Sequence, residues 1–227
     1  DAAGLAISES MKSQIRSYTV AERNAGDAVS MAQTAEGALG EVHEILGRMR
    51  ELAMQSSNGG LTSTDRGYIN TEFGSLQAEV TRIQSSAKFN GNKLVNSTAS
   101  TITFQVGLNN TASDKISVTF GGVGFTTLLA STTVLSGAGA TASLTALGRI
   151  DSAIATTSGA RSKFGSAMNR LQVATNNIQT MRLNLSGANS RIRDVDVADE
   201  TSKMSRNQVL SQAGISVLAQ ANQLPQL

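Results

Sequence analysis

The stretch MKSQIRSYTVAERNAGDAVSMAQTAEGALGEVHEILGRMRELA, residues 11–53, decides the fold because it has no proline and carries apolar residues at helical spacing. Positions taken alternately four and three residues apart fall on one face of a helix. The thirteen positions of this series are Met11, Ile15, Tyr18, Glu22, Ala25, Val29, Ala32, Glu36, Leu39, His43, Leu46, Arg50 and Ala53, and all but Glu22, Glu36, His43 and Arg50 are apolar. The pattern predicts one coiled-coil-like helix over residues 1–57. A helix of that length cannot bury its own stripe, so it needs helical partners.

Residues 58–86 supply the first partner. Asn58-Gly59-Gly60 can end the long helix, because glycine tolerates the left-handed backbone that closes helices. Residues 62–65, with the sequence TSTD, offer side chains that can cap the start of a new helix, which we expect over about residues 65–86. Its apolar positions repeat at spacings of four and three: Ile69, Phe73, Leu76, Val80 and Ile83. We therefore expect the chain to turn back as a helical hairpin.

The sequence changes character at Phe89-Asn90-Gly91. Residues 101–106 and 115–120 alternate apolar and polar side chains, with turn-forming residues between them, and this predicts a small β-hairpin. Residues 121–143, rich in Gly, Ser, Thr and Ala, read as a weakly structured connection.

Two more helices are expected after this connection. The first covers about residues 144–185, with a bend or break at residues 186–189, and its apolar face is Leu147, Ile154, Phe164, Met168, Leu171, Ile178 and Leu185. The second covers about residues 195–223, with the stripe Leu210, Ala213, Val217, Ala221 and Leu224, and Pro225 terminates it. No other segment of the chain supplies an apolar stripe on which this last helix can pack. The expected fold is mainly α, an elongated antiparallel bundle of long coiled-coil-like helices with a small β-hairpin.

Composition narrows the function. Aromatic residues make up 4% of the 227-residue chain, too few to fill a thick globular core. The net charge of +2 is spread along the chain, so we expect no nucleic-acid partner. The chain has no run of about 18 apolar residues, so the sequence predicts no membrane span. The chain has no cysteine and a single histidine, which leaves little scope for a metal site.

Three short motifs resemble parts of catalytic or phosphate-binding sites, but each lacks residues that such a site requires. His43-Glu44 begins like a zinc-protease helix, but Gly47 stands where the second histidine is needed. Ser85 and Lys88 have the spacing of a serine–lysine pair without its companion motifs, and residues 121–124 lack the Lys-Ser/Thr of a phosphate loop. We expect no cofactor and no enzyme.

Seven motifs stand in order along the chain: residues 1–8 (DAAGLAIS), 47–58 (GRMRELAMQSSN), 89–94 (FNGNKL), 104–107 (FQVG), 190–196 (SRIRDVD), 204–210 (MSRNQVL) and 219–223 (AQANQ). In these motifs the chain resembles bacterial flagellin, and the resemblance covers nearly the whole chain except about residues 121–143.

The resemblance implies a subunit of the bacterial flagellar filament, secreted to the cell exterior, that self-assembles for motility. It implies four segments: rod helices over 1–100, a hairpin and short variable connection over 101–143, a C-terminal rod helix over 144–190 and an inner-core helix over 191–227. By this resemblance the chain has a trimmed N-terminus and almost no outer domain, so by itself it is expected to stay monomeric. Two alternatives stay open: a hook–filament junction protein, and a surface binding module built on the same scaffold.

Site residues also follow from the resemblance. Aligned without gaps, Arg48, Leu52 and Glu72 match rod residues that pack between subunits and that, in similar flagellins, contact the vertebrate receptor Toll-like receptor 5. Glu41 is a weaker match, and Gly47 departs from the family's usual Gln. The stripe Leu210, Ala213, Val217, Ala221 and Leu224 is the implied polymerisation helix, where a flagellar export chaperone would also bind. Identical subunits are the main implied partner.

Overall fold

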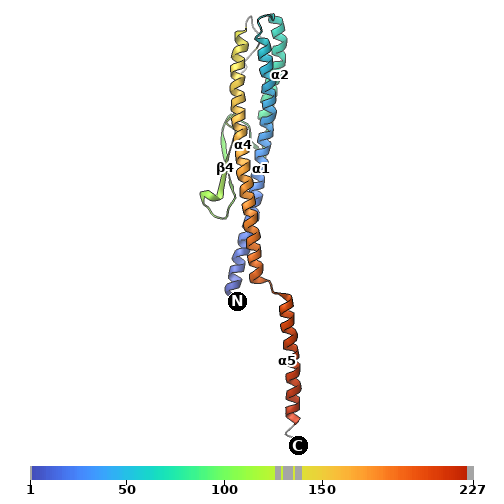
Figure 1. Ribbon diagram of the computed structural model, residues 1–227. Coiled ribbons are helices and arrows are strands. Elements are labelled where there is room, and N and C mark those ends of the chain that lie inside the picture. The colour runs from blue at the N-terminus through green and yellow to red at the C-terminus, as the bar shows by residue number, and fades with distance from the viewer. Residues whose placement is uncertain (1, 126–128, 130–134, 136–139, 224–227) are drawn as a thin grey trace. The chain divides into compact units, whose positions relative to one another are not determined.

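The computed structural model describes residues 2–125, 129, 135 and 140–223 (Figure 1). Its elements are α1 (Ala2–Ser56), α2 (Ser63–Ser86), β1 (Lys88–Phe89), β2 (Asn92–Lys93), β3 (Ser100–Gln105), a 3-10 turn (Ala112–Asp114), β4 (Lys115–Phe120), α4 (Thr141–Arg193) and α5 (Val197–Gln223). The chain divides into two units, one of Arg16–Met181 and one of Asp1–Ile15 with Arg182–Leu227. The mainly α fold class is confirmed.

In the larger unit, α1 and α4 run antiparallel along a seam of alanines. Each of the seam alanines of α1 is at most 3% exposed: Ala21, Ala25, Ala28, Ala32 and Ala35. Polar contacts from α1 to α4 recur every two heptads at the border of the seam. Glu22 accepts a bond from Gln179 at 2.7 Å, Glu36 accepts two from the Arg161 guanidinium at 2.7 and 2.9 Å, and Arg50 donates to Asp151 at 2.7 Å. Small side chains let the helices approach, and these contacts hold their register.

Larger side chains replace alanine where α2 joins. The later part of the α1 seam consists of Leu39, Val42, Leu46, Met49 and Leu52, all buried, and α2 packs Phe73 and Val80 into the same core. Thr62 caps α2 with a reciprocal pair of bonds, in which its side-chain oxygen accepts the Asp65 N–H and the Asp65 carboxylate accepts the Thr62 N–H. The predicted helical hairpin and its apolar face are confirmed.

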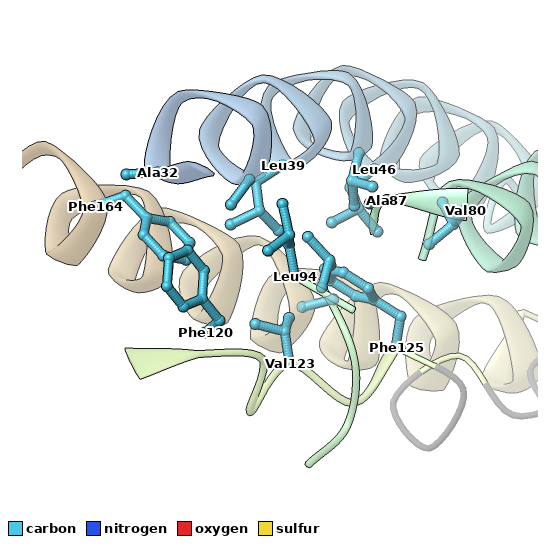
Figure 2. Packing of buried hydrophobic residues seen from close by; sticks show 14 of the residues in the cluster. Ala32, Leu39, Leu46, Val80, Ala87, Leu94, Phe120, Val123, Phe125 and Phe164 are labelled. Carbon is cyan, nitrogen blue, oxygen red and sulfur yellow. The ribbon is translucent and has the colours of Figure 1, made fainter. Parts of the chain in front are cut away.

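The β3–β4 hairpin lies against these helices and closes the core. Its strands pair antiparallel from Ser100 opposite Phe120 to Gln105 opposite Lys115. Ile116, Val118 and Phe120 point inward, and the Phe120 ring lies 5.4 Å from that of Phe164 on α4 (Figure 2). This hairpin too matches the sequence prediction.

Sequence reasoning missed a second, two-residue hairpin. Asn90 and Gly91 have φ of 46° and 81°, the left-handed values that a tight turn between β1 and β2 requires. The glycine-rich run that follows β4 was expected to be a tether, yet its start is held in place. The Gly121 N–H donates to the Leu94 carbonyl and the Val123 N–H to that of Asn96, both at 2.9 Å.

Two helix predictions need correction. First, the α1 stripe was assigned one residue late at every second position. The buried residues are Ala28, Ala35, Val42 and Met49, whereas the predicted Val29, Glu36, His43 and Arg50 lie beside them at the border of the seam. Second, α4 continues without a break through residues 186–189 to Arg193. There the Ser8 hydroxyl on α1 donates to the Asn189 side chain at 2.7 Å, which gives this end of α4 a partner.

Candidate assembly surfaces

Arg48 is the centre of a charged cluster on the surface that α1 and α2 share. Its guanidinium contacts Glu51 of the same helix at 2.9 Å and Glu72 of α2 at 2.8 Å. About half of the Arg48 and Glu72 side chains remains exposed, so the cluster is open to solvent. The hydrogen bonds that Arg48 donates to Glu51 and then to Glu72 raise the pKa of Arg48 above its ordinary value. The structure thus brings Arg48 and Glu72 together, and it adds Glu51, which the sequence analysis did not name.

The other two residues predicted for this surface lie differently. Glu41 is exposed on α1, about two turns before Arg48. Leu52 is only 2% exposed and belongs to the core. It therefore offers no side chain to a partner, because its face of α1 is the seam that packs inside the molecule. A usable surface at this site consists of Arg48, Glu51, Glu72 and Glu41.

Every described side chain of α5 is exposed, which makes this helix the second candidate surface. Leu210 and Val217, from the predicted stripe, are 63% and 67% exposed, and Ala213 and Ala221 are exposed as well. Leu224 lies outside the described residues. Such side chains normally lie in a core, so their exposure indicates a surface that is covered in an assembly.

The helix also has a second apolar face, which the sequence analysis missed. Val197, Met204, Ile215 and Leu218 are all more than half exposed; the first three share a face about 140° around the helix from Leu210 and Val217, and Leu218 lies between the two faces. A shallow hollow of about 670 Å³ lies along this second face, between Glu200 and Ile215. These residues recur at helical intervals in the sequence, so a search for more than one apolar stripe per helix finds this face without the structure.

The described part of the chain offers little for ligand chemistry. Within it, no three His, Asp or Glu side chains come close enough to hold a metal ion. His43 is partly buried on α1 with its Nδ1 atom unbonded, and position 47 is glycine. No helix in the described residues has both the length and the hydropathy to cross a membrane. Packing surfaces are the features left to explain.

Comparisons of the whole sequence with known protein families and relatives agree with one another. The bacterial flagellin N-terminal helical region matches residues 1–100, and the C-terminal helical region matches residues 147–227. A flagellin of Halalkalibacterium halodurans is 43% identical over 227 residues, which is 100% of this chain and 82% of that protein. The flagellar filament core protein flaB2 of Brachyspira hyodysenteriae is 36% identical over 239 residues, covering 100% of this chain and 83% of that one.

Solved structures give the same answer for the fold. The crystal structure of Bacillus cereus flagellin is similar with a TM-score of 0.60 and 31% identity, over 74% of this chain and 94% of that one. A putative flagellar hook-associated protein from Vibrio parahaemolyticus has a TM-score of 0.67 over 83% of this chain and 95% of that one, at 16% identity. At that identity the second likeness concerns the fold alone.

Proposed function

The chain belongs to the bacterial flagellin family, and from this membership we propose how its subunits assemble and which partners they meet. It is a structural subunit of the bacterial flagellar filament, in which identical copies associate. The observation that carries the assembly mechanism is α5, a helix of 27 residues whose described side chains are all exposed.

Burial of α5 against helices of neighbouring copies is the driving force that we propose. Each large apolar side chain taken out of water contributes about 1.5–3 kcal/mol, whereas ordering each residue of the helix costs about 1–2 kcal/mol. A single partner that covers one face leaves the opposite face wet. Assembly is therefore favoured only when several subunits contribute, which couples folding of this helix to filament growth.

The direct test is genetic. Deleting the gene in the host bacterium is expected to abolish swimming and remove the filament, and a copy of the gene supplied in trans is expected to restore both. Electron microscopy reads the filament and a swarming assay reads motility. Filaments of normal length and composition in the deletion strain would exclude this chain as their subunit.

We propose that Arg48, Glu51, Glu72 and Glu41 pack between subunits and, on a free subunit, offer a contact for Toll-like receptor 5. The support is the exposed Arg48 guanidinium, held in position by two carboxylates, because such a planar fork binds a partner's carboxylate or carbonyl well. A cell reporter for that receptor, stimulated with wild-type protein and with Arg48→Ala, tests the second role. Equal potency of the two proteins would remove it.

Further proposals follow from the family. We propose export to the cell exterior, a flagellar export chaperone that covers α5 before assembly, and no catalytic activity. The division into rod helices (1–100), hairpin and connection (101–143), C-terminal rod helix (144–190) and inner-core helix (191–227) is our proposal for the role of each segment. The proposed chaperone contact is tested by co-purification: a small chaperone should co-purify with the wild-type protein and should be lost with Leu210→Asp.

A hook–filament junction protein is the alternative, and it has one observation in its favour, the fold shared with the hook-associated protein of Vibrio parahaemolyticus. Sequence favours the filament, because both flagellin regions match and the sequence relatives include filament core proteins. Immunogold labelling separates the two, since a junction protein would mark only the base of the filament.

A further inference from the structure

A groove runs between strand β4 and helix α4 and is lined by cations without acids. It consists of three neighbouring hollows of about 420, 320 and 530 Å³. The first two share Lys163 and Phe164, and the last two share Arg170, so the hollows form one channel, here called the β4–α4 groove. Its charged lining residues are Lys163, Arg170 and Lys115.

These cations have no carboxylate partner in the part of the chain that the structure describes. Lys115 donates to the neutral Asn110 side chain at 2.6 Å, and Lys163 and Arg170 are exposed on α4. Seven residues separate Lys163 from Arg170, so they project from one helix face about 10 Å apart. Val173, 66% exposed, adds an apolar patch at one end of the groove. The groove therefore suits a short acidic segment with some apolar side chains.

One segment of this same chain has that chemistry. Residues 194–200, with the sequence DVDVADE, hold four acids and no base, and every side chain is exposed. Residues 194–196 lie outside any helix. Val195 and Val197, 63% and 72% exposed, could cover Val173.

We propose that the β4–α4 groove of one subunit binds residues 194–200 of a neighbouring subunit in the filament. This rests on the proposed assembly of identical copies. The contact joins two different surfaces of the same chain, and a heterologous contact of this kind extends into a helical polymer when its rotation does not close into a ring. Opposite charges at the two surfaces fix the register of neighbouring copies and suppress other pairings.

Cysteine crosslinking is a clean test because the natural chain has no cysteine. Filaments are isolated from a host strain that expresses full-length Ser166→Cys and Val195→Cys subunits together, and they are then oxidised mildly. We expect a disulfide-linked dimer on a non-reducing gel. Gln172→Cys is the matched control, since residue 172 is exposed on α4 about half a turn from Lys163, and it should give no dimer with Val195→Cys. Equal yields from the two pairs, or no dimer from the first in intact filaments, would overturn the proposal.

A charge swap adds a second readout. Lys163→Glu and Asp194→Lys are each expected to slow filament elongation at least about tenfold through repulsion between like charges, and the double variant should recover most of the rate. Failure of the double variant to recover would count against the contact.

Other occupants give different results. A disulfide within dilute monomers that carry both cysteines would place the segment in its own groove. Normal elongation of Lys163→Glu together with lost binding to heparin would assign the groove to an anionic polysaccharide. Either result overturns the proposal. Filaments without the crosslink would overturn only this inference, whereas the absence of this chain from the filaments of the wild-type host would overturn the proposed function with it.

Discussion

Arg66 shows how a single side chain closes one end of the bundle. It is 4% exposed, and its guanidinium donates to the carbonyls of Ser56 at 2.9 Å and Asn58 at 2.8 Å, at the end of α1. A helix C-terminus leaves carbonyls without partners and carries partial negative charge, so a cation is favourable there. Sequence reasoning missed this role because it assigned the end of the helix to the glycines alone.

We expect Arg66→Met to lower the free energy of unfolding by about 2–4 kcal/mol, since two charge-assisted bonds are lost and the Ser56 carbonyl loses its buried partner. Urea denaturation followed by circular dichroism measures the change. The control is Arg82→Met, which removes an exposed arginine of the same helix. A loss for Arg66→Met no larger than that of the control would show that water satisfies these carbonyls.

The α2 cap should make stability depend on pH. Bonds from the Thr62 hydroxyl and N–H hold the pKa of Asp65 below its ordinary value, so the ionised carboxylate stabilises the folded state. That contribution is present above about pH 4 and is lost as the pH falls through the lower folded pKa. We expect the thermal midpoint of Asp65→Asn to fall less between pH 5 and pH 2 than that of the wild type.

Thr62→Ala gives a second reading of the same cap at neutral pH, where we expect a loss of about 1 kcal/mol. A wild-type acid slope retained in Asp65→Asn would place the acid sensitivity elsewhere. Glu79 is the nearest candidate, because its bond with Arg82 also lowers its pKa.

The Arg48–Glu72 pair is expected to matter for assembly more than for folding. Exposed ion pairs add little stability, because water screens the charges and the side chains lose freedom. We expect Arg48→Ala to leave the thermal midpoint nearly unchanged and to reduce filament yield severalfold, measured by sedimentation. The exchange Arg48→Glu with Glu72→Arg keeps the internal pair and should not restore the yield. If it did, the pair would serve the fold of the subunit alone.

At the scale of the helix, the α1 seam changes from alanine to larger residues along its length. Alanines predominate among the buried residues over 21–35, and Leu, Val and Met predominate over 39–52, where α2 adds Phe73 and Val80 to the core. We expect Ala28→Leu to cost about 1–3 kcal/mol, because the extra atoms must push α1 and α4 apart. Val29→Leu, one position later and only partly buried, is the control and should cost less. Denaturant unfolding of the two variants measures the difference, and equal costs would mean that the seam is loosely packed.

The same seam shows why sequence alone placed half of the α1 core correctly. Ala25, Ala32, Leu39, Leu46 and Ala53 were assigned correctly because they recur every seven residues. Between these residues, the positions three and four residues further along are both apolar in places, such as Ala28 and Val29. The helical period alone therefore cannot decide which of the two is buried. The structure chooses because Glu36 and Arg50 have partners on α4, which lie in a different part of the sequence.

For the whole molecule, two separate apolar faces on α5, about 140° apart around the helix, imply contacts with more than one neighbour. We expect Leu210→Asp, on the first face, and Ile215→Asp, on the second, each to abolish filaments while the thermal unfolding of the monomer stays unchanged. Electron microscopy and calorimetry measure the two effects. Thr201→Asp is the control for added charge, and loss of filaments with this variant as well would mean that charge rather than apolar burial is being tested.

The sequence by itself determined the long helices, the hairpin of β3 and β4, the helical turn-back and the family, because periodic apolar spacing, capping residues and motifs are local properties of the chain. Tertiary structure alone decided which α1 positions are buried, that Leu52 is inside, that α4 runs through residues 186–189 and that Arg66 closes the end of α1. These depend on contacts between residues distant in sequence, where a neighbouring element supplies the missing apolar surface or hydrogen-bond partner.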